Sequence, residues 1–445
     1  MPFNESRFKM PEYLLLLFIL IQPFLDLITS LSLRLLQSSL TIGLLVRFAV
    51  LFFGLFYLFF LRKYPNKKRI ISYLIVLFVI LCINLINNFY VKSPFSISEE
   101  LKFILKTCYF LVMLFAYSVV FKSVEKELLK SKILNYIVYA MTIIGIVMVI
   151  AAVTGTSYQS YEGGKAGYIG WFYAGNELSA ILAMGFPIIV LTALKKSKWY
   201  WIPVFLVIFS LLSLGTKVGY LTILLVLCIG LIFSLLNNFG VPNKEFKKIP
   251  YVNILLTFFF LLGVIFYTPF SPIAKNMDIQ MSWLGINKNI DQPKAEKNHE
   301  KKEVNHVTDA QVQNLVFSGR EKFLHDQKNY FSHAPVSQKL FGMGYGGNYK
   351  TNPKMVEMDF HDLFFSFGII GSLIFIAPLL FFLIRALINI FSHFRRNFHY
   401  ENIFIGLAII LGVGIAYMAG HVLTAPGVSI YLAVLVSFLN SKLEY

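Results

Sequence analysis

The chain has 445 residues, of which 57% are hydrophobic and only 14% are charged, and its formal net charge is +17. Apolar runs of about 20 residues, the length that a helix needs to cross a hydrocarbon core about 30 Å thick, recur along it and exclude a soluble globular protein. Most Lys and Arg residues lie in short segments between these runs, which is a signal of membrane topology, so we expect no nucleic-acid partner. The composition predicts an all-α polytopic membrane protein.

About twelve transmembrane helices are predicted. The first apolar run contains Gln22, Pro23 and Asp26, which make a poor signal-peptide core, so we interpret it as a retained span. The predicted spans are residues 12–32, 40–61, 70–91, 102–121, 134–153, 176–194, 199–214, 217–236, 251–268, 361–390, 402–419 and 423–440. The chain then divides into nine spans within 1–268, one large loop at 269–360 and three spans within 361–445.

The charge of alternate loops predicts the orientation of these spans. Basic residues gather in the loops at 62–69, 122–133, 195–198, 237–250 and 391–401, whereas the loops between them carry few cations. Basic loops are normally cytoplasmic. Both termini are therefore expected in the cytoplasm, and the 269–360 loop is expected outside.

Two intramembrane charges lie near the start of the chain, Asp26 in the first predicted span and Arg47 in the second. Ionisable residues inside a bilayer are costly and are functional candidates. An ion pair that holds the two helices together is the simpler interpretation.

Two candidate anion-binding positions lie at the predicted outer ends of spans. Asn176 and Glu177 open a span after the glycine- and aromatic-rich loop at 154–175, and a helix N-terminus favours anions. The aromatic side chains of this loop could stack on sugar rings or form an interfacial belt. Lys217, two residues after Gly215 in a short turn, either binds an anion or extends into the membrane interface.

The long loop has two different halves, and a loop of more than about 15 residues is normally either functional or disordered. Residues 290–313 are charged and poor in large apolar side chains, which predicts a mobile segment. Residues 314–334 have the apolar spacing of an amphipathic helix that lies on the membrane surface. Glycines within 342–347 allow a tight turn before the chain re-enters the membrane at His361.

Arg320 lies on this loop in the sequence Ser318-Gly319-Arg320-Glu321. A guanidinium can bind a phosphate through two parallel hydrogen bonds, so Arg320 is a candidate substrate-binding residue. A solvated charge paired with Glu321 is the alternative.

Ionisable residues also cluster at the end of the loop, in the sequence EMDFHD. Asp359 and His361 are two residues apart and share one face of an extended segment. Apolar surroundings shift pKa values, so Glu357, Asp359 and His361 are candidates for a general base. Asp359 or Asp362 could instead cap the following helix, and one residue could do both.

The remaining histidines suggest no metal site. His421 lies at the predicted outer end of a span and is either an interfacial histidine or part of the same substrate-binding site. The other histidines of the long loop match no metal-binding spacing that we recognise: His299, His306, His325 and His333. We expect neither a metal nor another cofactor.

Several stretches, in this order, resemble the O-antigen ligase and polymerase superfamily of bacterial membrane proteins: GWFYAGNELSAILAMGFP, LLSLGTKVGYLTILLVL, SGREKF, LFGMGYGG and FHDLFFSFGIIGSLIF. The resemblance covers about residues 140–440. It implies an enzyme that moves a glycan from an undecaprenyl-diphosphate carrier at the outer face of the membrane. A ligase uses a lipid or protein acceptor, and a polymerase uses another carrier-linked repeat.

The resemblance also implies roles for particular residues. The family's loop arginine falls on Arg320, and its histidine before the following span falls on His361. An arginine of the family falls on Lys217, which keeps the charge but loses the bidentate geometry. Because Asp362 stands where the family often has Asn or Ser, and further carboxylates are near, the base could be Glu357 or Asp359 instead. We expect inverting, metal-independent transfer by a surface-polysaccharide polymerase or ligase, and in an organism without an outer membrane the product would be a capsule or cell-wall polysaccharide.

Two other classes of protein fit parts of the sequence. A transporter or flippase of lipid-linked saccharides would have polar residues in the middle of several spans and an internal repeat, and neither is clear here. A membrane scaffold or sensor without catalytic activity would leave the EMDFHD cluster dispensable.

Overall fold

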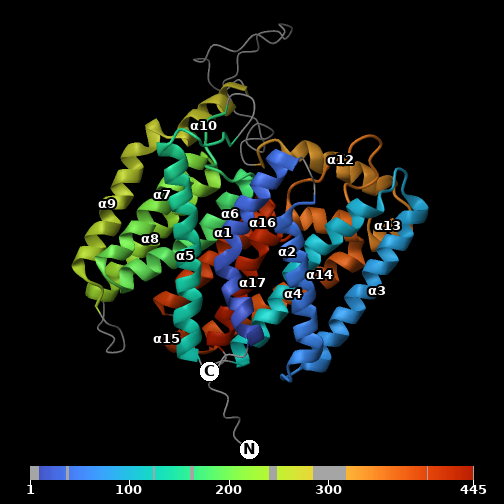
Figure 1. Cartoon of the computed structure of the whole chain (residues 1–445), viewed down its shortest axis with the longest axis horizontal. Coiled ribbons are helices and arrows are strands. Elements are labelled where there is room, and N and C mark those ends of the chain that lie inside the picture. The colour runs from blue at the N-terminus through green and yellow to red at the C-terminus, as the bar shows by residue number, and fades with distance from the viewer. Residues whose placement is uncertain are drawn as a thin grey trace, which may run out of the picture.

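The helices run between two opposite faces of the molecule (Figure 1). The computed structural model describes residues 10–36, 40–123, 126–160, 165–239, 248–283, 317–397 and 399–443. Within these ranges eleven helices are long and apolar enough to cross a membrane, and Lys198–Leu214 forms a shorter apolar helix. The predicted all-α polytopic fold is confirmed, and the helices agree with the count of about twelve spans.

The order of the elements follows the predicted spans closely. The helices that correspond to the predicted spans are α1 (Met10–Leu36), α2 (Ile42–Phe56), α3 (Lys67–Val91), α4 (Ile97–Ser123), α5 (Lys126–Val153), α6 (Gly175–Lys195), α7 (Trp201–Leu214), α8 (Lys217–Phe239), α9 (Tyr251–Tyr267), α14 (Asp359–Ser392), α16 (Tyr400–Met418) and α17 (Pro426–Leu443). Shorter elements are η1 (Tyr57–Leu61), η2 (Lys198–Tyr200), η3 (Thr268–Phe270), α10 (Pro272–Trp283), α12 (Arg320–His333), α13 (Val336–Phe341) and α15 (Phe394–Asn397).

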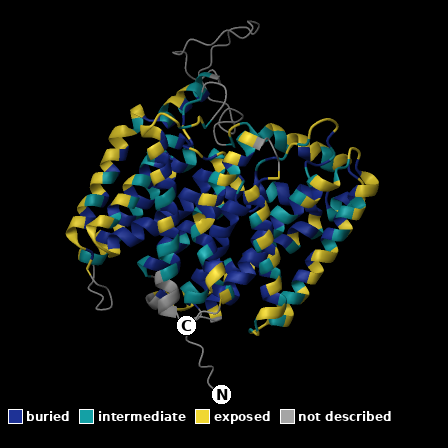
Figure 2. Ribbon diagram, in the orientation of Figure 1, coloured by how far each residue is buried: buried dark blue, intermediate teal, exposed yellow. Residues whose placement is uncertain are grey.

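The centre of the bundle is formed by α4, α6 and α17, which are buried along most of their length, whereas α3 and α9 lie at its edge (Figure 2). Small residues let these helices approach: a Cβ on Gly185 of α6 would lie 2.3 Å from the Met141 sulfur of α5. Polar side chains add bonds between helices, since Ser437 Oγ of α17 donates to the Leu114 carbonyl of α4 at 2.9 Å. Inside a bilayer such close packing and hydrogen bonding hold helices together, because lipid is as apolar as the helix surfaces.

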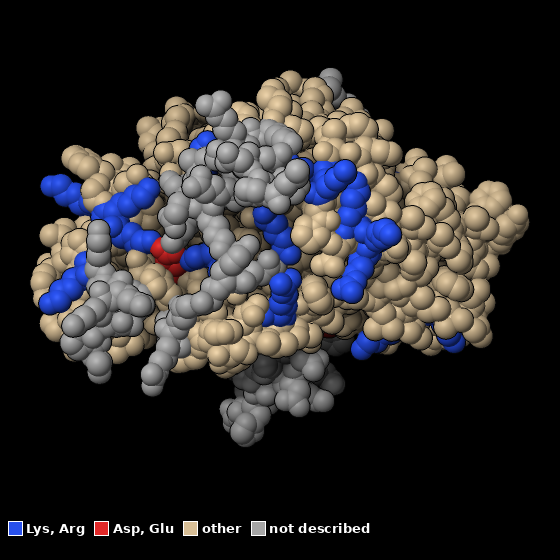
Figure 3. Space-filling model, turned by 90° about the horizontal axis from the view of Figure 1, so that it is seen from below, with Lys and Arg blue, Asp and Glu red and all other residues tan. Residues whose placement is uncertain are grey.

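The face where α1 begins is rich in basic side chains (Figure 3). α1 begins and α17 ends at the lower face in Figure 1, and α10 and α12 lie at the upper face. The lower face carries many Lys and Arg side chains (Figure 3). Here the buried carboxylate of Glu401 pairs with Lys195 at the end of α6 and with Lys442 of α17, the latter at 2.7 Å, so one acidic residue ties three helix ends together.

The part of the long loop that contains α12, residues 317–360, is attached to the helical bundle through this helix. The predicted mobile residues 290–313 lie outside the described part of the chain. α12 coincides with most of the helix predicted over 314–334, but one of its apolar side chains, Phe331, packs on α14, with its ring centroid 5.1 Å from that of Phe364 and 5.7 Å from that of Phe365. The apolar side of this helix therefore has a protein neighbour.

The glycine-rich turn after α13 interlocks with a break in α14. α14 departs from helical geometry at Gly368 (φ 67°, ψ −171°). This frees the Ser366 carbonyl, which accepts the Gly344 N–H at 3.0 Å and Asn84 Nδ2 of α3 at 2.9 Å. Gly342 (φ 97°) makes the approach possible, because a Cβ there would lie 2.1 Å from the Ser366 oxygen. We call these contacts the Gly342–Gly368 interlock.

We expect Gly342→Ala to lower the free energy of unfolding by about 1–3 kcal/mol or more, because a side chain in this backbone region is strained and would also meet the Ser366 carbonyl. The measurement is the thermal unfolding midpoint of purified protein. Gly414→Ala is the matched control, since a Cβ at Gly414 has no neighbour within 4 Å. Equal midpoints for the two variants would contradict the interlock.

Candidate active site

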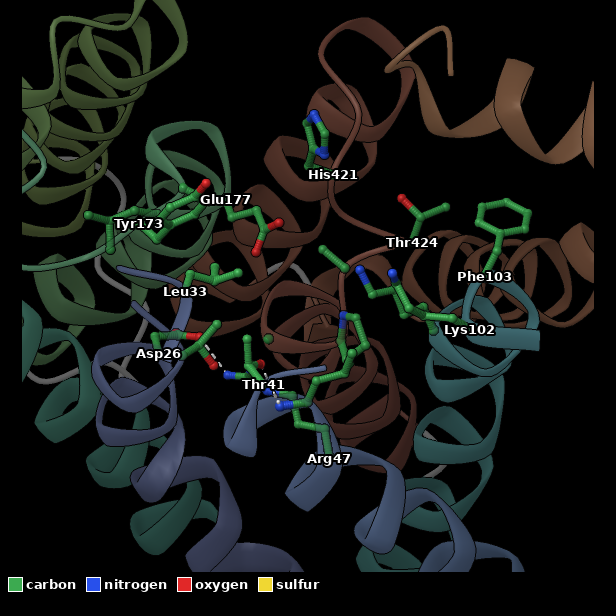
Figure 4. A pocket seen from close by; sticks show the side chains of 18 of the residues that line it. Asp26, Leu33, Thr41, Arg47, Lys102, Phe103, Tyr173, Glu177, His421 and Thr424 are labelled. Carbon is green, nitrogen blue, oxygen red and sulfur yellow. Dashed lines mark hydrogen bonds and ion pairs between the residues drawn. The ribbon is translucent and has the colours of Figure 1, made fainter. Parts of the chain in front are cut away.

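A cavity of about 390 Å³ lies among α1, α2, α4, α6, α14 and α17 (Figure 4). The first turns of five helices contribute to its lining, and all five helices start at the face that carries α12: α2, α4, α6, α14 and α17. Its polar lining consists of Asp26, Thr29, Thr41, Arg47, Glu99, Lys102, Lys106, Glu177, Glu357, Asp362, His421 and Thr424. Four aromatic side chains complete it: Phe103, Phe172, Tyr173 and Tyr345. The cavity therefore combines charges of both signs with flat apolar surfaces.

The predicted pair of Asp26 and Arg47 forms one wall of this cavity. Arg47 Nη2 lies 2.6 Å from Asp26 Oδ1, and its Nε donates to Gln22 Oε1 at 3.0 Å. Gly427 of α17 leaves room for the guanidinium, because a Cβ there would lie 2.9 Å from Nη2. The expected ion pair between α1 and α2 is confirmed, and its position gives it a second use as part of the cavity lining.

Two further cations, Lys102 and Lys106, line the cavity one helical turn apart on α4. The Lys102 ammonium lies 3.1 Å from Glu99 Oε1. Lys106 interacts electrostatically with Glu177 but makes no hydrogen bond with a residue of the described ranges. Its ammonium is therefore available to an anion that enters the cavity.

His421 and Glu357 face each other where the cavity meets residues 317–360 of the long loop. His421 Nε2 lies 3.8 Å from Glu357 Oε2, and Lys354 Nζ lies 2.5 Å from Glu357 Oε1. Both His421 and Glu357 have left-handed backbones, with φ of 60° and 65°. Such geometry costs about 1–3 kcal/mol in a non-glycine residue and persists only where the surrounding structure imposes it.

The charges around this pair favour its ionised form. The contact with His421 and then with Lys354 lowers the pKa of Glu357 to about 2, although burial acts in the opposite direction. Burial alone would lower the pKa of His421, but its contact with Glu357 and the charges of Glu177 and Asp359 outweigh burial and raise that pKa. At neutral pH the pair is therefore drawn towards an imidazolium and a carboxylate.

Asp359 holds the turn that carries His421. Its buried carboxylate accepts the backbone N–H groups of His421, Val422 and Leu423 at 3.1, 2.7 and 2.8 Å. It also accepts the Thr424 hydroxyl at 2.8 Å. With four donors on its two oxygens and no position in the cavity lining, Asp359 acts as a structural anchor.

Asp362 anchors the segment that carries Glu357. Its carboxylate accepts the backbone N–H groups of Val356 at 2.7 Å and Met358 at 3.2 Å, immediately before α14 begins. The two aspartates of the EMDFHD sequence therefore fix both residues of the His421–Glu357 pair.

His361 lies elsewhere. It is absent from the cavity lining, its ring lies 6.3 Å from that of Tyr417 in α16, and Lys328 of α12 is its electrostatic neighbour. Its Nδ1 is buried without a hydrogen-bond partner in the described part of the chain. Of the three predicted candidates for a base, only Glu357 lines the cavity.

Arg320 and Lys217, the predicted phosphate ligands, lie outside the cavity lining. Arg320 Nε lies 3.9 Å from Glu357 Oε2, so Arg320 belongs to the surroundings of the His421–Glu357 pair. Lys217 Nζ donates to Gln280 Oε1 of α10 at 2.6 Å. Lys165 lies within electrostatic range of both Arg320 and Lys217. Burial, together with the charge of Arg320, lowers the pKa of Lys165.

Some cavity residues at the starts of α6 and α4 were not predicted as site residues from the sequence. Asn176 is exposed and outside the cavity lining, whereas its neighbour Glu177 lines the cavity. Lys102 and Lys106 are intramembrane cations four residues apart in a predicted span, a pattern that could have marked them.

A buried ion pair positions Tyr345 at the cavity. Lys92 Nζ and Glu100 Oε1 are 2.6 Å apart, with both side chains almost completely buried. Glu100 accepts the Tyr345 N–H at 2.8 Å, and Lys92 donates to the Tyr345 carbonyl at 2.6 Å. The turn between α3 and α4 thus fixes one aromatic wall of the cavity.

Almost the whole chain matches a known protein family. The model of the family described as O-antigen ligase like membrane protein matches residues 9–445. No curated protein matches the chain. The match includes α2 and α4, which supply the cavity-lining cations and lie before the stretches that carry the sequence resemblance.

We expect Asp359→Asn to lower the free energy of unfolding by about 1.5–3 kcal/mol, the cost typical of losing hydrogen bonds to a buried charged group. The thermal unfolding midpoint measures this effect. Asp326→Asn on the exposed side of α12 is the control and should melt like the wild type. An unchanged midpoint for Asp359→Asn would show that the turn at 420–424 does not need this anchor.

The His421–Glu357 pair predicts a pH-dependent contribution to stability. The pKa of Glu357 is lowered to about 2, so its contribution is present above its ordinary pKa of 4.5 and is lost as the pH falls towards 2. The pKa of His421 is raised, so its contribution is present below 6.5 and is lost as the pH rises through the raised value. The difference in unfolding midpoint between wild type and His421→Gln should be largest between about pH 5 and 6 and should shrink at higher pH. A difference that stays constant from pH 5 to 9 would contradict this assignment.

Proposed function

The chain belongs to the family of O-antigen ligase like membrane proteins, and from this we propose that it transfers a glycan from an undecaprenyl-diphosphate carrier to an acceptor hydroxyl. Membership of the family supports a role as a polysaccharide ligase or polymerase. The observation that carries the finer proposal is the cavity itself, which gathers three cations, a histidine–carboxylate pair and four aromatic side chains.

In the proposed orientation the cavity lies towards the outer face of the cytoplasmic membrane. The face where α1 begins and α17 ends is basic, and basic segments favour the cytoplasm (Figure 3). The cavity and the described parts of the long loop, residues 269–283 and 317–360, belong to the opposite face (Figure 1), so both termini are cytoplasmic in this proposal. A carrier lipid in the outer leaflet can then bring its glycan to the cavity without crossing the bilayer.

The proposed reaction is a displacement at the anomeric carbon of the donor sugar. The acceptor oxygen forms a bond to this carbon, the bond from the carbon to the diphosphate oxygen breaks, and the acceptor proton passes to a base. Negative charge grows on the leaving diphosphate, and Arg47, Lys102 and Lys106 are placed to stabilise it without a metal. Attack on the side opposite the leaving group inverts the configuration, and the carrier diphosphate is released.

Glu357 is our proposed proton acceptor, with His421 holding its carboxylate in place. An oxocarbenium-like transition state draws electrons from the attacking hydroxyl, so a carboxylate can accept its proton, as in inverting glycosidases. Glu357 lines the cavity, whereas His361, the position that the family resemblance favours, does not. Arg320 beside Glu357 and the neighbouring Lys165 add positive charge that attracts the anionic donor.

The acceptor decides the product. A second carrier-linked repeat gives a capsule or cell-wall polymer, and a lipid or protein acceptor gives a single ligation. The aromatic side chains Tyr173 and Tyr345 are suited to stack on the sugar rings of the donor glycan.

We expect Glu357→Gln to reduce the rate of carrier-diphosphate release by about 100-fold or more, the contribution typical of a positioned general base. The measurement uses purified protein in lipid nanodiscs with carrier-linked oligosaccharide, and Asp326→Asn serves as the control. His361→Ala is assayed beside it. If His361→Ala loses as much while Glu357→Gln remains active, the base is His361 and our assignment is wrong.

In cells, loss of the proposed transferase leaves carrier-linked repeats stranded outside the membrane. Repeats that accumulate on the cytoplasmic side instead would favour a flippase and contradict the proposed function.

A further inference from the structure

A second hollow, of about 310 Å³, lies on a different side of α1 from the cavity. It is lined by Leu27, Ile28, Ser30, Leu31 and Arg34 of α1 and by Tyr158 and Trp171 of the segment before α6. We propose that this α1 groove binds one anionic phospholipid, with its phosphate on Arg34 and an acyl chain along Leu27 and Leu31. This proposal does not depend on the proposed glycan transfer.

The positive charge of Arg34 is only partly satisfied within the protein. Its Nε donates to Ser30 Oγ and its Nη2 to the Phe172 carbonyl, each at 3.3 Å. The guanidinium carbon lies 3.5 Å from the centre of the Tyr158 ring. Among the described residues no carboxylate forms an ion pair with it, so a positive charge and further N–H groups face the groove. A phosphate is the anion that this planar donor set binds best in a membrane.

The apolar side chains of the groove run along α1 from Arg34 into the membrane, as the acyl chain of a phospholipid does. Leu27, Leu31 and Arg34 follow one stripe of α1, at spacings of four and three residues. Leu31 is 58% exposed and Ile28 is 38% exposed, as expected for side chains that face lipid. Arg34 lies near the upper end of the helix, so a chain on this stripe has its headgroup at the guanidinium. Trp171 lies beside it, and tryptophan is enriched at this depth.

The position of the groove favours a resident phospholipid over the reacting carrier lipid. Asp26, Thr29 and Leu33 of α1 line the cavity, whereas Leu27, Leu31 and Arg34 line the groove. A phosphate on Arg34 is therefore on the far side of α1 from the His421–Glu357 pair. None of the described residues that line the groove is acidic, so a lipid with net negative charge neutralises the guanidinium better than a zwitterionic lipid.

Occupancy of the groove is coupled to a wall of the cavity. Arg34 holds the Phe172 carbonyl, and the guanidinium carbon lies 5.5 Å from the centre of the Tyr173 ring. Phe172 and Tyr173 both line the cavity. A bound lipid phosphate would fix Arg34 and with it this segment, so phosphatidylglycerol should also raise the thermal unfolding midpoint.

Native mass spectrometry of the purified full chain, titrated with phosphatidylglycerol or phosphatidylcholine, tests the proposal. We expect one phosphatidylglycerol to bind more tightly than phosphatidylcholine, and Arg34→Gln to weaken it about tenfold or more, since a charge-assisted bidentate contact is lost. Arg69→Gln, which removes an exposed cation at the start of α3, is the matched control and should bind like the wild type.

Leu31→Trp provides a second variant in case Arg34→Gln does not fold, because it fills the groove at an exposed position without changing charge. It should also lose the bound phosphatidylglycerol. The proposal is overturned if Arg34→Gln or Leu31→Trp binds like the wild type, or if Arg69→Gln loses as much as Arg34→Gln. It is also overturned if undecaprenyl diphosphate displaces phosphatidylglycerol from an Arg34-dependent site, because the groove would then belong to the carrier lipid.

Discussion

A carboxylate with no contact to solvent needs hydrogen bonds to replace those of water, and Asp359 obtains four from the turn before α17. The turn also needs the carboxylate. Its three successive backbone N–H groups point to one place and form a binding site for an anion. Gly420 completes the fit, since a Cβ there would lie 2.5 Å from the Glu357 carbonyl oxygen. This contact joins the start of α14 to the start of α17 and brings His421 to Glu357, which are far apart in the chain.

Charged groups in the rest of the cavity are also compensated by neighbours of opposite charge. Isolated charges in a bilayer are costly, and the cations of the cavity each have an acidic residue near them: Asp26 beside Arg47, Glu99 beside Lys102 and Glu177 near Lys106. Such pairing lets a helical bundle hold charged groups without a ligand. An entering diphosphate meets cations that are already positioned, which is the arrangement that stabilises developing negative charge most effectively.

The sequence contains enough to predict the helices, since a bilayer demands long apolar runs and the basic segments alternate with them. It also predicted the Asp26–Arg47 pair, because two opposite charges in adjacent spans have few other partners. It could not assign the roles within EMDFHD. Spacing does not reveal that Asp359 turns towards a loop more than 60 residues later, or that His361 faces α16. Those directions depend on tertiary packing around α14, which no local pattern encodes.

The Gly342–Gly368 interlock bears on how proteins of this architecture can diverge. Backbone contacts fix the path of the chain from α13 into α14, and the anchors of Glu357 and His421 lie beyond this point. Closing a longer loop costs free energy only in proportion to the logarithm of its length. Insertions or deletions between α10 and α12 therefore leave the polar geometry of the cavity unchanged, so evolution can alter the length of that connection while the chemistry stays constant.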